Sequence, residues 1–262
     1  MSDIQLECDE RLDRVNEKIT LIQKKDGLTF GTDAFLLAAY IKQQKYSHAV
    51  ELGAGTGIIS LLLAAREKFA TIDAVEIQED FYFITKRNVE HNLFDDKIKV
   101  IKDDVRCLTA VSIGEEADVV FSNPPYMRTD TGKRNVSDRK YIARHEVCGG
   151  IDDFCAAAYR LLKHGGKFYC VWRPDRLSGL MSALRDNRLE PKTMVFVHSD
   201  SASEPSMVLV SAVKGGAEGL KIMPPLFLYE DEIAQGGART MTCRAKAIYD
   251  TMSFEEDGTW KA

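Results

Sequence analysis

The stretch His48-Ala49-Val50-Glu51-Leu52-Gly53-Ala54-Gly55-Thr56-Gly57 decides the predicted fold of this chain. A short apolar run ends in three alternating glycines, and the apolar segment 58–66 follows as a predicted helix. Strand, glycine loop and helix form the unit that cradles a ligand in a doubly wound α/β sheet. Glycine permits positive φ and close approach of a ligand to the backbone. We therefore predict that Gly53, Gly55 and Gly57 bind a cofactor.

The spacing of these glycines narrows the class of cofactor. The loop reads G-x-G-x-G, with Glu51 two residues before the first glycine, whereas the dinucleotide fingerprint reads G-x-G-x-x-G. This difference argues against a nicotinamide or flavin cofactor. A glycine turn without a ligand is the alternative, which the flanking strand and helix disfavour.

Acidic residues follow the next two predicted strands. Strand 71–76 ends in Glu76, about twenty residues beyond the glycine loop, the offset at which an acid reaches ribose hydroxyls. Strand 98–101 is followed by Asp104, which is placed to meet the exocyclic amine of an adenine. For Asp104 alone, a solvated loop carboxylate is nearly as good an interpretation.

The fourth strand, 118–122, leads into Asn123-Pro124-Pro125-Tyr126. The two prolines fix φ and keep the preceding residue extended, so the strand cannot continue as a helix. Asn123 and Tyr126 would then be held rigidly at the carboxyl end of a strand, where open α/β sheets bind ligands. The alternative is a plain Pro-Pro loop that carries a tyrosine.

The remaining segments complete the predicted order. Thr32 or Asp33 is expected to cap a helix that runs to residue 41, and a capped core helix without a further role is the alternative for Asp33. Asp152 or Asp153 is expected to cap a helix that the glycines of 164–166 end. The other expectations are an irregular arm (1–18), strands 19–23, 167–172, 193–197 and 207–213, and helices 174–189 and 241–249.

We therefore predict an α/β protein with a doubly wound, Rossmann-like sheet of seven strands. The sheet is mostly parallel, and an antiparallel hairpin closes its edge. We expect a single domain over 1–262, with a lead-in and amino-terminal helix (1–45), the core (46–214) and a carboxyl-terminal tail (215–262).

Composition restricts the class of protein. A hydrophobic fraction of 45% and a charged fraction of 29% are those of a folded globular chain. We see no signal peptide, membrane span or metal-binding Cys and His spacing, and we expect a monomeric cytoplasmic protein without a metal or a membrane partner.

One segment is basic although the net charge of the chain is −5. Residues 127–145 carry six basic and two acidic side chains, a net charge of +4. We predict that this segment binds RNA, although a charge run alone is usually a solvated surface. The basic residues are Arg128, Lys133, Arg134, Arg139, Lys140 and Arg144.

Taken in order, these motifs resemble the class I S-adenosylmethionine-dependent methyltransferases. The chain is most similar to the tRNA adenine-N6 methyltransferase family that acts just 3′ of the anticodon of a valine tRNA. It differs from that family at 234–239, where the ending is longer. The segments that carry the resemblance are 30–38, 51–57, Glu76, Asp104, 123–126, Arg128, Arg139, 143–146, 224–226 and Tyr229.

The resemblance implies S-adenosylmethionine as cofactor, tRNA as substrate, and Asn123, Pro124 and Tyr126 as catalytic residues. The Asn123 oxygen and the Pro124 carbonyl would accept hydrogen bonds from the adenine amine, and Tyr126 would stack on the base. The implied cofactor-binding residues are Thr32, Asp33, Glu51, Gly53, Gly55, Gly57, Glu76, Asp104, Val105 and Asn123.

Two other functions remain open. A protein glutamine-N5 methyltransferase acting on a translation factor would use the same tetrapeptide, but it gives no reason for clustered arginines. A catalytically silent S-adenosylmethionine-binding module is the other alternative, and the intact Asn123 and Tyr126 argue against it.

Overall fold

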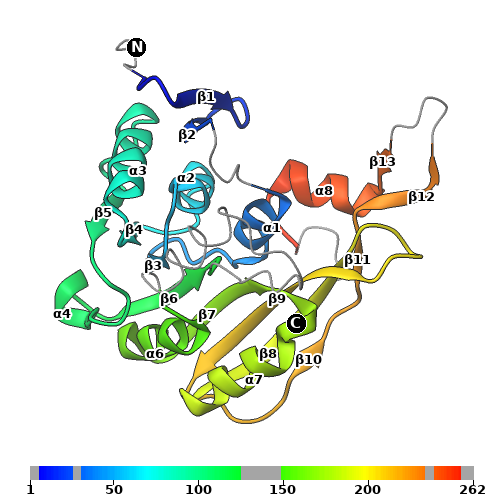
Figure 1. Ribbon diagram of the computed structural model, residues 1–262. Coiled ribbons are helices and arrows are strands. Elements are labelled where there is room, and N and C mark those ends of the chain that lie inside the picture. Colours follow the sequence, from blue (N-terminus) through cyan, green and yellow to red (C-terminus); the bar gives the residue numbers. More distant parts are fainter. Residues whose placement is uncertain (1–5, 26–30, 125–148, 234–238, 255–262) are drawn as a thin grey trace, which may run out of the picture.

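The computed structural model of the protein describes residues 6–25, 31–124, 149–233 and 239–254. Its main sheet has the strand order β10-β8-β9-β7-β6-β3-β4-β5, with β11 beside β8 (Figure 1). Strands β5, β4, β3, β6 and β7 are parallel, and β9 is antiparallel to β7 and β8. The predicted α/β fold with its antiparallel closing hairpin is confirmed. The main strands are β3 (His48–Leu52), β4 (Thr71–Glu76), β5 (Ile98–Lys102), β6 (Ala117–Ser122), β7 (Leu162–Trp172), β8 (Leu189–His198) and β9 (Pro205–Lys214).

The closing hairpin does not end the sheet. Two short strands from the tail, β10 (Lys221–Ile222) and β11 (Leu226–Phe227), pair in parallel with the outer side of β8. Leu226 is fully buried and Met223 is 6% exposed, so apolar burial holds this part of the tail against the sheet. The described sheet therefore has two strands more than the predicted seven.

Side-chain alternation along β6 shows how the two faces of the sheet are covered. Val119 and Phe121 belong to one buried cluster and Val120 to the other, as the twofold period of a strand requires. The first cluster packs against α1, α2, α3 and α8, and the second against α4, α6 and α7 (Figure 1). The helices are α1 (Thr32–Tyr40), α2 (Ile58–Ala65), α3 (Glu79–His91), α4 (Ala110–Ile113), α6 (Ile151–Leu161), α7 (Leu177–Asp186) and α8 (Cys243–Thr251).

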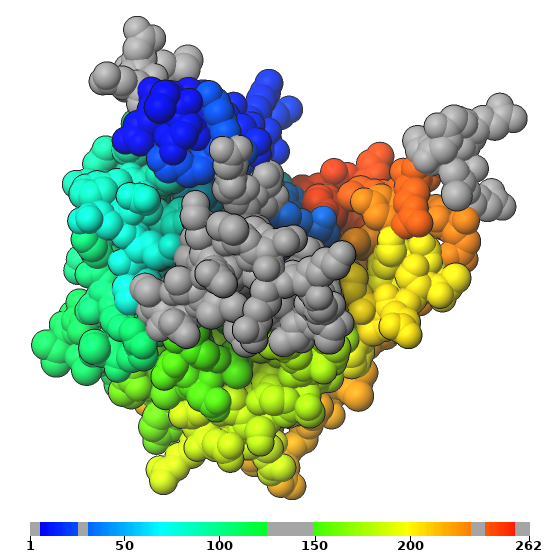
Figure 2. Space-filling view, in the orientation of Figure 1, coloured from blue at the N-terminus to red at the C-terminus, as the bar shows by residue number. Residues whose placement is uncertain are grey.

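The expected irregular arm is partly wrong, because residues within 1–18 form a strand. β1 (Glu10–Arg14) pairs antiparallel with β2 (Thr20–Lys24), and the hairpin lies against α3 (Figure 2). Glu10 is only 3% exposed, and its Oε1 lies 2.8 Å from Nη1 of Arg87 on α3. A strand held by backbone pairing and a distant arginine leaves no apolar pattern in its own sequence.

Two predicted helix caps are also wrong. Gly31, not Thr32 or Asp33, is the N-cap of α1, and both residues lie in the first turn. Gly150 is the N-cap of α6, and its N–H donates to Oδ2 of Asp153 over 2.8 Å. In both helices a glycine takes the extended cap position. The first-turn Asp153 of α6 accepts from its own N-cap, whereas the first-turn Asp33 of α1 has a partner far away in the chain.

Other boundaries shift between α6 and β8. Strand β7 starts at Leu162 and continues through residues 164–166, which were expected only to stop the preceding helix. The expected helix from 174 is a 3-10 turn (Pro174–Arg176) followed by α7, and the short helix α4 was not expected. In the tail, β12 (Tyr229–Ile233) pairs antiparallel with β13 (Arg239–Met241), and residues 234–238 between them lie outside the described chain.

The strand order reverses between β3 and β6, which are neighbours in the sheet although the chain leaves them toward opposite edges. Open α/β sheets bind ligands at the carboxyl ends of strands at such a switch point. The Ser122 hydroxyl at the end of β6 donates to the Leu52 carbonyl at the end of β3 over 2.7 Å. The glycine loop and Asn123 therefore start from the same point of the sheet.

Candidate active site

All three glycines of the loop after β3 need the left-handed region of backbone space. Their φ angles are 72° at Gly53, 60° at Gly55 and 79° at Gly57. A Cβ at Gly57 would lie 2.7 Å from Cγ2 of Thr85, whereas one at Gly55 would meet nothing within 4 Å. The loop is thus packed on the helix side and open at Gly55, as a loop that receives a ligand must be.

Two polar residues of α3, which the sequence analysis missed, support this loop. The Thr85 hydroxyl donates to the Gly55 carbonyl over 2.6 Å, and Nδ2 of Asn88 donates to the Thr56 carbonyl over 2.9 Å. Oδ1 of Asn88 also accepts from the N–H of Ile22 in β2 over 2.7 Å. Both side chains are fully buried. Polar residues three apart on one helix face were the available signal, although their partner could not be read from it.

Glu76 lies at the end of β4, directly beside the loop. Its Oε2 accepts from the Gly55 N–H and its Oε1 from the Gln78 N–H, each over 2.8 Å. The residue is 3% exposed, and burial raises the pKa of its carboxyl group. The structure thus brings together Glu76 and the glycine loop, which the sequence analysis linked only by their spacing.

Glu51 is buried beneath the loop rather than exposed on it. Its Oε2 accepts from the N–H of Ser60 over 3.2 Å and from the Ser60 hydroxyl, so it binds the first turn of α2. Burial raises the pKa of Glu51 to about 8. A contact with the cofactor stays a prediction for this residue.

Asp104 lies beyond the end of β5 and is already bound to a neighbouring side chain. Both of its carboxylate oxygens lie 2.9 Å from Nε of Arg106, and this guanidinium holds the pKa of Asp104 below its usual value. Val105 beside it is 5% exposed and belongs to the apolar cluster beneath α6. Recognition of an adenine amine by Asp104 stays a prediction. The amine would have to share the Asp104 carboxylate with Arg106.

The Asn123 side chain, at the end of β6, contacts a carboxylate in the first turn of α1. Its Nδ2 donates to Oδ2 of Asp33 in the first turn of α1 over 2.9 Å, while Oδ1 of Asp33 accepts from the Ala34 N–H over 2.9 Å. A carboxylate only accepts hydrogen bonds, so the amide must turn its NH₂ toward Asp33 and its oxygen away. The structure thereby joins the 32–33 segment to the asparagine, an arrangement that the sequence analysis did not predict.

Part of the predicted site lies outside the described residues. Pro124 is described and buried, but Pro125 and Tyr126 are not. The same holds for the predicted RNA-binding residues Arg128, Lys133, Arg134, Arg139, Lys140 and Arg144.

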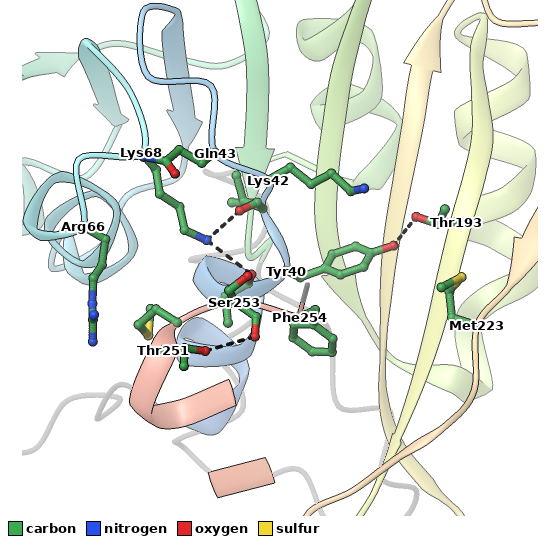
Figure 3. Close-up of a pocket in the computed structure, with 13 residues that line it drawn as sticks. Tyr40, Lys42, Gln43, Arg66, Lys68, Thr193, Met223, Thr251, Ser253 and Phe254 are labelled. Carbon is green, nitrogen blue, oxygen red and sulfur yellow. Dashed lines mark hydrogen bonds between the residues drawn. The ribbon is translucent and has the colours of Figure 1, made fainter. Parts of the chain in front are cut away.

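A cavity of about 390 Å³ opens at the other end of α1 (Figure 3). Its basic side chains do not converge on a ligand. The Lys68 ammonium turns toward the end of α1 and donates to the carbonyls of Ala39 and Ile41 over 3.3 and 2.7 Å. Arg66 extends away from it and donates to the Asp250 carbonyl over 2.9 Å. This cavity contains none of the predicted site residues.

Two negative findings apply to the described residues alone. No helix among them is long and apolar enough to cross a membrane. No group of three His, Cys, Asp or Glu side chains in these ranges is arranged to hold a metal ion.

A glycine loop, an acid and a rigid asparagine at the switch point of this sheet are the arrangement of a class I methyltransferase. The cofactor of that class is S-adenosylmethionine. Residues 24–186 match the family model of the methyltransferase small domain, and the chain belongs to this family.

Named relatives are similar along most of the chain. A protein of Dyadobacter fermentans, named tRNA1(Val) (adenine(37)-N6)-methyltransferase, is 28% identical over 82% of this chain and 88% of its own length. A protein of the same name from Phocaeicola vulgatus is 31% identical over 74% of this chain and 81% of its own length. A solved structure, a predicted O-methyltransferase from Agrobacterium tumefaciens, superposes with a TM-score of 0.67 at 22% identity. It covers 85% of this chain and 97% of that one, and it supports the fold.

Proposed function

We propose that this protein transfers a methyl group from S-adenosylmethionine to the N6 amine of an adenine in tRNA, just 3′ of the anticodon of a valine tRNA. The observation that carries the proposal is the Asn123–Asp33 hydrogen bond at the end of β6, beside the glycine loop. The names of the relatives from Dyadobacter fermentans and Phocaeicola vulgatus support the same substrate.

The residues around the loop suit S-adenosylmethionine. Glycines with positive φ leave the loop open at Gly55, and the Glu76 carboxylate, beside the Gly55 and Gln78 N–H groups, would accept from ribose hydroxyls. Asp104 and Val105 would border the adenine of the cofactor. Glu51, Thr32, Asp33 and Asn123 complete the proposed set. When bound, the cofactor supplies an electrophilic methyl group.

The proposed chemistry depends on how the amine is held rather than on a strong base. The lone pair of adenine N6 is delocalised into the ring, so the amine is a poor nucleophile. The Asn123 oxygen, turned away from Asp33, and the Pro124 carbonyl would accept its two N–H groups and favour a pyramidal nitrogen. The new N–C bond would form as the S–CH3 bond breaks and leaves a neutral thioether, and the nitrogen would then release one proton to solvent. Tyr126 would stack on the base, which is worth about 1–3 kcal/mol.

A tRNA substrate accounts for the basic segment 127–145. Its net charge of +4 would bind phosphates, and an anticodon-loop adenine is already partly unstacked, which lowers the cost of extruding it. We propose that a single domain (1–262) acts as a monomer in the cytoplasm, without a metal.

The test is methyl transfer from labelled S-adenosylmethionine to bulk tRNA that lacks N6-methyladenosine, followed by mapping of the labelled nucleotide. We expect N6-methyladenosine in valine tRNA next to the anticodon. Asn123→Ala should give no product, and its loss of methyl transfer should far exceed any loss of cofactor affinity. Label in a translation factor but not in tRNA would instead identify a glutamine methyltransferase. Cofactor binding without transfer to either substrate would identify the silent module.

A titration tests the RNA-binding segment separately. Replacing Arg139 and Arg144 by alanine should weaken tRNA binding at low salt. The slope of log Kd against log salt should also decrease, by the amount expected for the loss of about two phosphate contacts. Replacing the exposed Lys18 and Lys45 removes the same charge outside that segment and is the matched control. An equal loss in both variants would exclude a specific contribution of the segment.

A further inference from the structure

Helix α8, from the tail, packs on the first turn of α1. The rings of Tyr249 and Phe35 are stacked, with centroids 4.3 Å apart and an interplanar angle of 12°. Figure 1 shows the two helices side by side, and in Figure 2 their surfaces adjoin next to the sheet. The tail thus contacts the turn that carries Asp33.

Helix α8 is itself firmly anchored to the sheet. The Thr242 hydroxyl accepts from the Ala245 N–H over 3.1 Å and donates to the Phe227 carbonyl over 2.7 Å, so it caps the helix and ties it to β11. Ala245 is fully buried and Ile248 is 2% exposed. Tyr249 is therefore presented to α1 from a fixed support rather than from a loose carboxyl terminus.

The turn that Tyr249 contacts carries the carboxylate that meets Asn123. Thr32 and Phe35 flank Asp33, whose carboxylate accepts from the Asn123 amide over 2.9 Å. Among the described residues, Asp33 carries the only carboxylate shown to contact the Asn123 amide. A small rotation of the first turn of α1 would move this carboxylate.

We propose that Tyr249 is a positioning residue of the methyl-transfer site, which holds the first turn of α1 so that Asp33 orients the Asn123 amide. This gives the tail a role in catalysis, and it rests on the proposed function. Tyr249 touches no reacting atom in this arrangement. Its effect passes through the stacked ring of Phe35 to the turn that carries Asp33, and from there to Asn123.

The kinetic test is a double-mutant cycle between Tyr249 and Asp33. Tyr249→Ala should lower kcat about tenfold or more with little change in KM for tRNA, because misplacement of a reacting group acts on the transition state. Tyr249→Phe keeps the stack and should retain most of the activity. In an Asp33→Ala background, Tyr249→Ala should cause no further loss, whereas a full additional loss would overturn the proposal. Tyr46→Ala, at a side chain that is 92% exposed, is the control.

An NMR measurement decides the proposal even if the protein does not methylate tRNA. The Asn123 side-chain NH₂ signals can be assigned by their absence in Asn123→Ala. In Tyr249→Ala, or in Tyr249→Leu if the alanine variant folds poorly, they should shift toward the values that Asp33→Ala produces. Tyr46→Ala should leave them unchanged. Unshifted signals in a folded Tyr249 variant would refute the positioning role, and inactivity of the wild type on tRNA would refute only the proposed function.

Discussion

The Asn123 amide and the Asp33 carboxylate, 90 residues apart in the chain, meet over 2.9 Å. The contact fixes which end of the amide faces the carboxylate, because a carboxylate can only accept. It therefore decides which atom of Asn123 is available to a substrate amine, and it makes the pair the most informative place to test the site.

Exchanging the two side chains tests this pair. Asn123→Asp would place two carboxyl groups about 3 Å apart, which raises the pKa of one of them because both cannot ionise at low cost. The variant should keep residual activity at low pH and lose it as pH rises and the shared proton leaves, to about a hundredth of the wild-type kcat or less.

Adding Asp33→Asn to this variant restores the hydrogen bond with its direction reversed. The amide at position 33 would then donate to the carboxylate at position 123. The double variant should recover at least about tenfold in kcat and lose the pH dependence. Initial rates between pH 6 and about 9 measure both effects. No recovery in the double variant would show that the hydrogen bond is not what orients Asn123.

Glu76→Ala should weaken cofactor binding more than it slows the reaction. The change removes the proposed acceptor for the ribose hydroxyls of the cofactor and leaves the Gly55 and Gln78 N–H groups without their carboxylate partner. A loss of about 1.5–3 kcal/mol, or roughly tenfold to a hundredfold in Kd, is expected for hydrogen bonds to a charged group. Equilibrium dialysis with S-adenosylmethionine measures it. Glu79→Ala, an exposed neighbour, is the control, and equal effects would contradict the role of Glu76.

Gly57→Ala should destabilise the protein by about 2–3 kcal/mol, because alanine is strained at φ 79° and its Cβ would press on Thr85 Cγ2. Adding Thr85→Ser removes that methyl but keeps the hydroxyl that binds Gly55, so part of the loss should return. Urea unfolding measures both.

Gly179→Ala in α7 is the matched control for Gly57. A Cβ there meets nothing within 4 Å, and the change should stabilise the protein by about 0.5–1 kcal/mol. No recovery in the Gly57→Ala, Thr85→Ser double variant would mean that the backbone strain alone accounts for the loss.

The buried Glu51 predicts how stability depends on pH. Its pKa rises from 4.5 to about 8 on burial, so the folded state keeps a proton that the unfolded state loses. Its contribution to the free energy of unfolding is therefore fully present below about pH 4.5 and decreases as pH rises toward 8, by at most about 1.4 kcal/mol per pH unit. Burial raises the pKa of Glu76 as well, in the same direction.

Glu51→Gln keeps an acceptor for Ser60 but cannot titrate, so it should flatten this decrease. Urea denaturation at several pH values measures the slope, with Glu67→Gln, on an exposed turn, as the control. An unchanged slope in Glu51→Gln would show that Glu51 is ionised in the folded protein.

Much of the sheet could be predicted from local sequence. Strands β3 and β4 have the predicted bounds, because each is an apolar run between polar or glycine breakers. The glycine loop and Glu76 were identified by spacing, because a βαβ unit keeps nearly constant lengths. Strand β1 was missed, since its partners are backbone groups of β2 and a distant arginine, and neither leaves a local pattern.

The sequence by itself determined the order of the main strands β3 to β9, the glycine loop and the identity of the residues at the ends of β3, β4 and β6. These features follow from φ restrictions, apolar periodicity and fixed loop lengths, which act over a few residues. The tertiary structure decided which of those residues meet. Asp33 orients Asn123 rather than capping its own helix, Glu51 binds α2 beneath the loop, and α8 supports α1. Such contacts join segments far apart in the chain, and they form only once packing of the sheet and its helices has fixed where each side chain can reach.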